Sequence, residues 1–194
     1  MKKIAIVTLS DFNNYGNRLQ NYALERIITS QGYDVVSLVD FRPNLLKTSV
    51  KTIIKKDGIK FTDRMKKIRR LKNFLDFDKK YVNTFPVNAG EFSSVSDDEY
   101  HCFIVGSDQV WNPDWAKYTY DRMFLRFCSP TKRISYAASF GVDKIPEKWV
   151  DKYKAGLIDF KALSVREDKA VDIVKNTIGI TCHKVLDPTM LLER

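Results

Sequence analysis

The chain has 194 residues, of which 44% are hydrophobic and 29% are charged, and its formal net charge is +9. This composition is ordinary for a folded globular protein and does not indicate disorder. No apolar run approaches the roughly 18 residues that a membrane-spanning helix needs.

The first 39 residues predict a strand, a helix and a second strand. Residues 3–9 form an apolar run that is typical of a buried strand. Residues 17–31 carry apolar side chains at spacings of three and four, which favours a helix, and Gly32 is suited to end it. Residues 35–39 are again apolar and predict the second strand of a parallel strand–helix–strand unit.

Residues 44–80 are predicted to form a basic helical insertion of one short and one longer amphipathic helix. Residues 42–80 hold 14 Lys and Arg against 4 Asp and Glu, a net charge of +10, so the rest of the chain is nearly neutral. Three interpretations fit: the solvated face of packed helices, contact of residues 47–80 with an anionic membrane or a lipid-linked substrate, and binding of nucleic acid. The first is the simplest, and nucleic acid is the least favoured partner.

The rest of the chain predicts further alternation of strands and helices. Residues 85–96 read as a loop, and residues 123–127 as a short strand or helix. The remaining predicted elements are strands at 102–105, 134–138, 162–165 and 184–186, and helices at 146–160 and 169–176. The expected fold class is therefore α/β, with a Rossmann-like, doubly wound and mostly parallel sheet.

Polar segments follow the predicted strands. Because the carboxyl ends of parallel strands lie at one edge of a sheet, and ligands bind there in open α/β folds, we expect these segments to line one cleft. They are residues 10–17, 40–44, 106–112, 139–141, 166–168 and 187–189.

The segment at 10–17 joins the first strand to the first helix. Asn14, Tyr15, Gly16 and Asn17 are candidate substrate-binding residues, because the amino end of a helix offers free N–H groups and glycine admits a ligand close to the backbone. The alternative is an ordinary helix cap built by one of the two asparagines. The segment has no GxGxxG pattern and does not predict a standard dinucleotide site.

The segment at 106–112 places short polar side chains around one tryptophan. Asp108 could accept hydrogen bonds from sugar hydroxyls or act as a base, and Trp111 could stack on a sugar ring. Ser107, Gln109 and Asn112 are further candidate binding residues. The alternative is that Trp111 anchors the core and Asp108 caps a turn.

Two other strand ends contribute candidates. Arg166 could grip a carboxylate or phosphate through parallel hydrogen bonds, or instead pair with the acids that follow it. Ser139 is a candidate binding residue. The isolated cysteines and histidines lack the spacing of a metal site, so no metal is predicted.

Five motifs in order give the chain a family resemblance. They are NYGNRLQNYAL at 14–24, VGSDQVWN at 105–112, YAASFG at 136–141, SVRE at 164–167 and LDPT at 186–189. Together they resemble the polysaccharide pyruvyl transferase family over nearly the whole chain. Many members have aspartate where this chain has Asn17.

The resemblance implies transfer of a pyruvyl group from phosphoenolpyruvate, the donor substrate, to two hydroxyls of one sugar, with no further cofactor. The acceptor would be a glycan or lipid-linked sugar for a cell-surface polysaccharide, and the enzyme would be cytoplasmic, at the inner face of the membrane. Asp108 and Arg166 would be its catalytic residues. Family members have two Rossmann-like halves, as in GT-B glycosyltransferases, so residues 1–194 would form the N-terminal domain, with the C-terminal domain and the general acid absent and the isolated chain inactive.

Two other functions remain open. One is a non-catalytic module of Rossmann-like fold that binds sugars or anions, which Asn17 favours because an amide cannot act as a carboxylate base. The other is a fragment of a GT-B-like glycosyltransferase, which would need a nucleotide site that the motifs do not provide.

Overall fold

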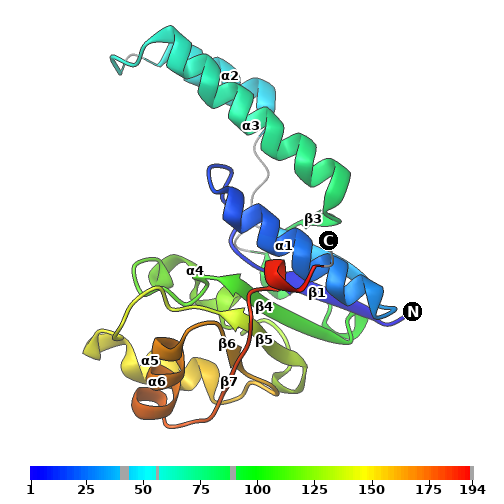
Figure 1. The fold of residues 1–194 in the computed structure, drawn as a ribbon, viewed down its shortest axis with the longest axis vertical. Helices are drawn as coiled ribbons and strands as arrows, with labels where there is room; N and C mark the ends of the chain where they lie inside the picture. The colour runs from blue at the N-terminus through cyan, green and yellow to red at the C-terminus, as the bar shows by residue number, and fades with distance from the viewer. Residues whose placement is uncertain (40–43, 56, 88–90, 193–194) are drawn as a thin grey trace.

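A parallel β-sheet forms the centre of the molecule (Figure 1). The computed structural model describes residues 1–39, 44–55, 57–87 and 91–192, and within these ranges the sheet has seven strands in the order β3-β2-β1-β4-β5-β6-β7, all paired in parallel. The strands are β1 (Lys3–Val7), β2 (Asp34–Val39), β3 (Thr84–Pro86), β4 (Cys102–Asp108), β5 (Arg133–Ala138), β6 (Ser164–Val165) and β7 (His183–Lys184). This confirms the doubly wound α/β fold.

Helices connect the strands. The α-helices are α1 (Tyr15–Ser30), α2 (Leu45–Ile54), α3 (Phe61–Tyr81), α4 (Ala116–Met123), α5 (Val150–Leu157) and α6 (Asp168–Asp172). Shorter turns of 3₁₀-helix lie at Phe92–Ser94, Asp97–Glu99, Pro130–Lys132, Glu147–Trp149 and Pro188–Leu191, and a π-helix at Ile173–Ile178 extends α6.

The two faces of the sheet are covered by different layers. Alternate residues of β1 point to opposite faces. Ile4 and Ile6 pack in a cluster with Leu24 of α1, whereas Ala5 and Val7 belong to the larger cluster formed with the helices that follow β4. The large buried side chains of that second cluster include Trp111, Phe124, Phe140 and Tyr153. Figure 1 shows α1 on one side of the sheet and α5 and α6 on the other.

The strand order places a switch point between β1 and β4. The chain moves outward from β1 through β2 to β3, then returns to β4 beside β1 and continues to β7. The connections that leave β1 and β4 therefore diverge, which opens a crevice beyond the carboxyl ends of these two strands.

Most predicted elements are confirmed, and three are corrected. β3 lies where a loop was expected, because Thr84–Pro86 pairs with the far end of β2. β4 continues through Asp108, so the segment that was expected to be a loop begins as strand. Residues 124–127 form turns rather than a strand or helix, and the helix lies before them, in α4. The polar segment predicted at 40–44 falls mainly on residues 40–43, outside the described ranges.

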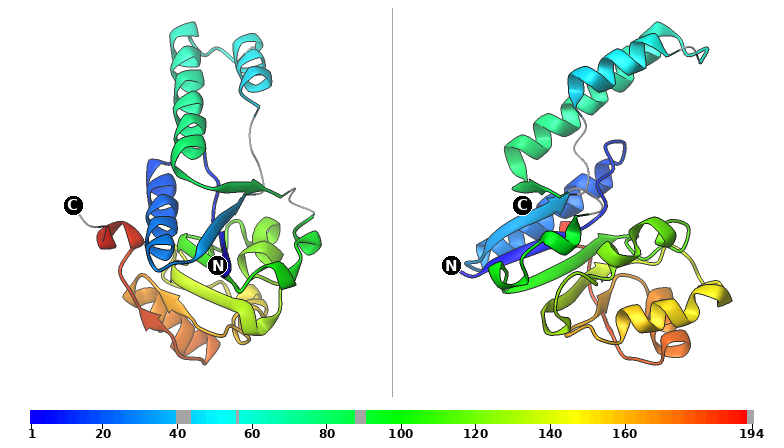
Figure 2. Two further views of the ribbon diagram at one scale, coloured as in Figure 1. Left: turned by 90° about the vertical axis from the view of Figure 1, so that its right-hand side faces the viewer. Right: turned by 180° about the vertical axis from the view of Figure 1, so that it is seen from behind.

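Helices α2 and α3 form an arm that projects from the body of the protein (Figures 1 and 2). The base of α3 is fixed to α1: Tyr15 stacks on Phe74 at 4.7 Å between ring centroids, and Arg18 pairs with Asp78 at 3.2 Å, with both charged side chains buried. Among the residues that the structure describes, none of the helices has both the length and the apolar character needed to cross a bilayer.

Candidate functional site

The first turn of α1 places Asn17 in the crevice. Asn14 is the N-cap of α1, and its side chain accepts a hydrogen bond from the Asn17 backbone N–H at 3.1 Å. This cap fixes the first turn of the helix. The Asn17 side chain, which is buried, accepts from the Asp11 backbone N–H at 3.3 Å and points its amide group toward β4.

Asn17 meets Asp108 at the switch point. Its Nδ2 donates to Oδ2 of Asp108 at 2.9 Å, while Oδ1 of Asp108 accepts from the Gln109 backbone N–H at 2.8 Å. The carboxylate is thus held in one orientation by a donor from each side of the crevice. The sequence-based prediction that these two segments meet is confirmed.

The end of β4 has an unusual backbone that brings this carboxylate into position. Gly106 has φ +115°, and a Cβ there would lie 2.2 Å from the carbonyl oxygen of Tyr136 on β5. Asp108 itself has φ +83°. A side chain other than hydrogen at position 106 would therefore clash with the neighbouring strand.

A second network links β4 to the strand ends farther along the sheet. Oδ2 of Asp187 accepts from Ser107 Oγ at 3.0 Å and from Arg166 Nη1 at 2.9 Å, and its Oδ1 accepts from the backbone and the hydroxyl of Thr189. Arg166 also donates through Nε to Glu167 at 2.9 Å. The sequence predicted either anion binding or a salt bridge for Arg166, and the structure shows salt bridges to Glu167 and Asp187.

These contacts shift the pKa values of both partners. Burial alone would raise the pKa of Asp187, but the hydrogen bonds from Thr189, Arg166 and Ser107 outweigh it and lower the pKa below its usual range. Burial likewise acts to lower the pKa of Arg166, and its bonds to Asp187 and Glu167 outweigh that effect and raise it. The pair is therefore charged at neutral pH.

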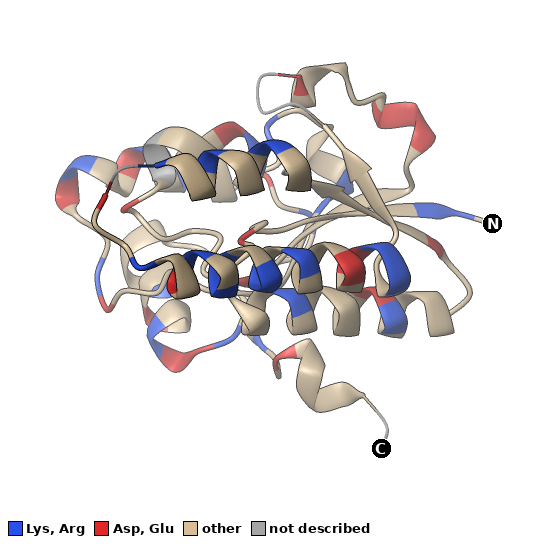
Figure 3. Cartoon of the chain, turned by 90° about the horizontal axis from the view of Figure 1, so that it is seen from above, with Lys and Arg blue, Asp and Glu red and all other residues tan. Residues whose placement is uncertain are grey.

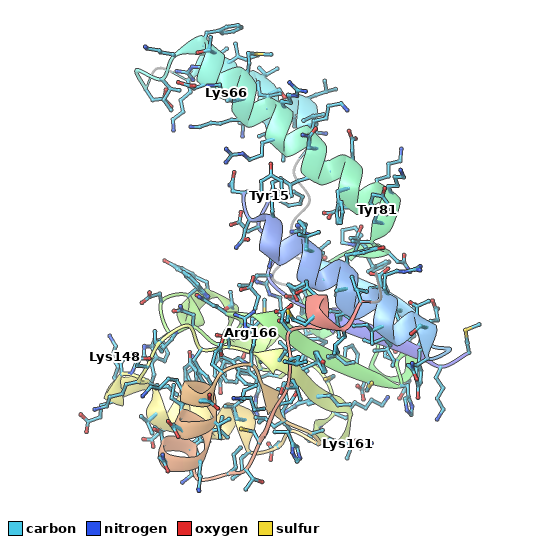
Figure 4. All side chains as sticks on the ribbon, in the orientation of Figure 1. Tyr15, Lys66, Tyr81, Lys148, Lys161 and Arg166 are labelled. Carbon is cyan, nitrogen blue, oxygen red and sulfur yellow. The ribbon has the colours of Figure 1, made fainter. Side chains whose placement is uncertain are left out.

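A pocket of about 340 Å³ lies at this point, between α1 and the ends of β4, β6 and β7. It is lined by Asn14, Gly16, Asn17, Leu19, Gln20, Asp108, Arg166, Asp187 and Thr189. The only cationic side chain in this lining is Arg166, whose charge two carboxylates offset. The pocket therefore offers carboxylate and amide groups rather than an uncompensated positive charge (Figure 4 labels Arg166).

Other predicted residues lie nearby but outside this pocket. Gln109 and Ser139 line a neighbouring pocket of about 280 Å³, together with Glu167. The Asn112 side chain donates to Gln109 Oε1 at 3.1 Å and is itself buried. Ser107 is also buried, and it acts on the site through Asp187.

Two predicted binding residues have structural roles instead. Trp111 has 0% of its surface exposed, donates from Nε1 to the Met123 carbonyl at 2.9 Å and packs on Phe124 and Phe140. Its ring cannot stack on a sugar, so that expectation is wrong. Tyr15 lies against α3 (Figure 4), and it does not line the pocket.

Sequence reasoning missed Gln20 and did not place Asp187 among the site residues. Gln20 lies one helical turn after Asn17, on the same face, and that spacing was an available signal. Its Nε2 donates to Thr8 Oγ1 at 3.1 Å, and Thr8 donates to the Ser107 carbonyl at 3.0 Å, so it helps to join α1 to β4. Asp187 lies in the segment at 187–189 that was expected at the cleft, and it also stabilises a turn by accepting from the Thr189 backbone N–H at 3.0 Å.

No metal centre is visible in the described ranges, where no three His, Cys, Asp or Glu side chains gather in a group that could hold an ion. What the site holds is a pair of carboxylates, Asp108 and Asp187, each fixed by donors from other strands or helices.

Comparison with known proteins identifies the family. A family model described as polysaccharide pyruvyl transferase matches residues 14–194. Searches of curated proteins and of solved structures each returned no match. The matched range begins at the Asn14 cap, extends through Asp108 and Arg166, and covers most of the chain. The protein belongs to the polysaccharide pyruvyl transferase family.

Proposed function

We propose that this chain provides the acceptor side of a pyruvyl transferase, and that the pocket at the switch point binds the two hydroxyls of a sugar that receive the pyruvyl group from phosphoenolpyruvate. The observation that carries the proposal is the Asn17–Asp108 pair, a carboxylate and an amide fixed side by side at a pocket of about 340 Å³. Paired carboxylate and amide groups suit two neighbouring hydroxyls of a saccharide, because each hydroxyl both donates and accepts a hydrogen bond.

The charge of the pocket favours a neutral polyol over the donor. Phosphoenolpyruvate carries a carboxylate and a phosphate, and the pocket lining offers it two carboxylates and one cation that is already paired. The pocket carboxylates would repel the negative charges of phosphoenolpyruvate. The donor is therefore expected at the rim, where Arg166, which is 30% exposed and uses two of its five N–H groups in ion pairs, can still contact an anion.

The proposed transfer requires a group that accepts protons from the sugar hydroxyls. The methylene carbon of phosphoenolpyruvate gains a proton, the carbon that bears the phosphate becomes electrophilic, and two sugar oxygens replace the phosphate there. The two hydroxyl protons are balanced by the one gained at carbon and the one that leaves with phosphate. We assign to Asp108 the acceptance of one hydroxyl proton, with Asn17 orienting its carboxylate through the hydrogen bond at 2.9 Å.

Calorimetric titration of the 194-residue chain tests the proposal. The probes are a panel of hexopyranosides, covering glucosides, galactosides, mannosides and N-acetylhexosaminides, and separately phosphoenolpyruvate. We expect at least one saccharide to bind, and the isosteric Asp108→Asn variant to bind it at least tenfold more weakly, because the substitution replaces one of the two acceptor oxygens of Asp108 with an NH2 group that can only donate.

Asp172→Asn is the matched control, because Asp172 is an exposed carboxylate on α6 and does not line the pocket. It should leave saccharide binding unchanged. Binding of phosphoenolpyruvate with no saccharide binding, or equal loss in both variants, would contradict the assignment of this pocket to the acceptor. The transfer itself is measured as phosphate released from phosphoenolpyruvate in the presence of the bound saccharide.

A further inference from the structure

The arm formed by α2 and α3 has its apolar side chains on the outside. α2 has no buried residue. Four of its aliphatic side chains are exposed. They are Leu46 at 78%, Val50 at 56%, Ile53 at 45% and Ile54 at 68%. At about 100° per residue these four lie within an arc of about 100°, so they form one continuous stripe.

The opposite side of α2 packs on α3 and is mostly polar, with Thr48, Ser49 and Thr52 beside the half-buried Leu45. Thr48 and Thr52 line a pocket of about 310 Å³ together with Ile68 and Leu71 of α3. An amphipathic helix that packs on its own protein turns its apolar face inward. α2 does the reverse, so its apolar stripe is available to a surface outside the chain.

Arg64 holds the two helices in this arrangement. It is buried and bonds to the Thr52 carbonyl at the end of α2, to the Ile59 carbonyl at 3.1 Å and to Asp57 at 2.6 Å. One guanidinium thus ties α2, the connection and α3 together. The outward stripe is therefore part of an ordered hairpin rather than a loose segment.

Basic side chains border the stripe. Lys47 and Lys51 lie along one edge of it, and further exposed basic residues cover α3 (Figure 3). These are Lys66, Lys67, Arg69, Arg70 and Lys72. On α3, Phe61 and Met65 are also exposed, at 63% and 44%. Aliphatic side chains flanked by lysines are the pattern of a helix that lies in the interface of an anionic bilayer.

We propose that the α2–α3 arm docks the protein on an anionic lipid surface, with the stripe Leu46, Val50, Ile53 and Ile54 inserted among the lipids and the flanking lysines on the headgroups. Charge complementarity selects this occupant over a second copy of the chain, because residues 42–80 carry a net charge of +10 and two such arms repel each other. It also selects lipid over nucleic acid, because phosphate groups alone leave the aliphatic stripe uncovered.

The arm is connected to the candidate site through α1. Tyr15 and Arg18, which contact α3, lie on the same helical turns as the pocket residues Asn17 and Gln20. Docking of the arm would therefore hold the pocket at a fixed distance from the lipid surface. The lipid-binding proposal does not depend on the function proposed for that pocket.

Co-sedimentation of the 194-residue chain with vesicles tests this proposal. The probes are vesicles of phosphatidylcholine alone and of phosphatidylcholine with phosphatidylglycerol. We expect binding to the anionic vesicles only, weakened by added salt. Replacing Leu46, Val50 and Ile54 by Ser should lower the partition coefficient at least tenfold, because apolar burial in the interface contributes to binding.

A second variant isolates the charge. Lys47→Gln, Lys51→Gln and Lys66→Gln together should lower partitioning about 100-fold at low salt, since each basic residue near an anionic surface contributes about fivefold. The matched controls change as many side chains on the body: Lys148, Lys154 and Lys161 to Gln, and Ile158, Leu186 and Met190 to Ser. All six are exposed, and Figure 4 shows Lys148 and Lys161 far from Lys66 on the arm.

Circular dichroism establishes that each variant is folded, and light scattering establishes whether the chain self-associates. Specific loss of vesicle binding in the two arm variants supports the proposal. Absence of vesicle binding by the unmodified protein, equal loss in the body controls, or self-association or nucleic-acid binding through the arm without vesicle binding would each overturn it.

Discussion

Nδ2 of Asn17 lies 2.9 Å from Oδ2 of Asp108, and this hydrogen bond joins the first turn of α1 to the end of β4 across 91 positions of sequence. It spans the switch point of the sheet, where the two connections diverge. The pair therefore has a structural role, because it joins the start of α1 to the end of β4. It also lies where an α/β fold binds its ligand.

Exchanging the two groups tests the pair. Asn17→Asp would place two carboxylates in contact, and their repulsion raises the pKa of one of them. We expect the variant to lose about 1–3 kcal/mol of unfolding free energy at pH 7 and to recover most of it below about pH 4, as one carboxyl takes up a proton. The double variant Asn17→Asp with Asp108→Asn restores a carboxylate–amide pair and should regain stability at pH 7. Urea denaturation measures all three proteins, and independent, additive losses would show that the two side chains do not interact.

The Asp187 network predicts an acid-sensitive contribution to stability. Because its folded pKa lies below the ordinary value of an aspartate, about 4, the contribution is present above about pH 4 and is lost as the pH falls through the folded pKa. Asp187→Asn should cost about 1–3 kcal/mol at pH 7, since Arg166 and Ser107 lose a charged acceptor. The difference from the unmodified protein should shrink toward pH 2 in chemical denaturation. A difference that does not change with pH would show that the charge of Asp187 is unimportant.

Glu25 predicts the opposite pH dependence. Burial raises its pKa above the ordinary value of a glutamate, although hydrogen bonds from the Asn83 backbone N–H and the Ser37 hydroxyl partly oppose this. Its stabilising contribution is therefore present below about pH 4.5 and is lost as the pH rises through the folded pKa. The neutral variant Glu25→Gln should become more stable relative to the unmodified protein between pH 4 and pH 8. Denaturation curves at these two pH values that differ in the other direction would contradict the assignment.

Gly106 should tolerate no side chain. Gly106→Ala places a methyl group 2.2 Å from the Tyr136 carbonyl oxygen, in addition to the strain of φ +115°. We expect a loss of more than about 3 kcal/mol or failure to fold. Gly32→Ala is the matched control, because φ is +84° there but nothing lies within 4 Å of the added methyl group. The control should lose only about 1 kcal/mol by thermal denaturation, and equal losses would refute the steric argument.

Trp111 should matter for stability and not for ligand contact. Trp111→Phe removes the hydrogen bond to the Met123 carbonyl and part of a fully buried ring, so we expect a loss of about 2–4 kcal/mol. Saccharide affinity measured below the melting temperature should stay within about threefold, a change of well under 1 kcal/mol. A large loss of saccharide affinity in the folded variant would show that Trp111 contacts the ligand after all.

The sheet could be predicted from the sequence because a buried parallel strand is a run of apolar residues that ends abruptly in polar ones, as at residues 3–9 and 102–105. β3 was missed because its three residues form a strand only by pairing with the end of β2, a long-range contact with no local pattern. α4 was missed for a related reason, since the apolar residues of this region that fix it, such as Met123 and Phe124, gather at its end.

The candidate site was predictable in its location but not in its detail. Polar segments after apolar strands identified Asn17, Asp108 and Arg166, and the structure places all three at one pocket. The direction of a ring cannot be deduced in this way, because Trp111 and its polar neighbours occupy consecutive positions of a tight turn whose conformation depends on packing. The ion pair of Arg166 with Asp187 could not be predicted either, because Asp187 lies 21 residues later in the sequence.

The most direct test of the acceptor-side assignment is a residue-resolved NMR titration of the ¹⁵N-labelled chain with the hexopyranoside that binds most tightly in calorimetry. We expect amide shifts at Gly16, Asn17, Gln20 and Gln109, which surround the Asn17–Asp108 pair. We expect no comparable shifts along α2 and α3, and loss of the shifts in Asp108→Asn. Shifts confined to other surfaces, or shifts at these amides that only phosphoenolpyruvate produces, would contradict the acceptor-side assignment.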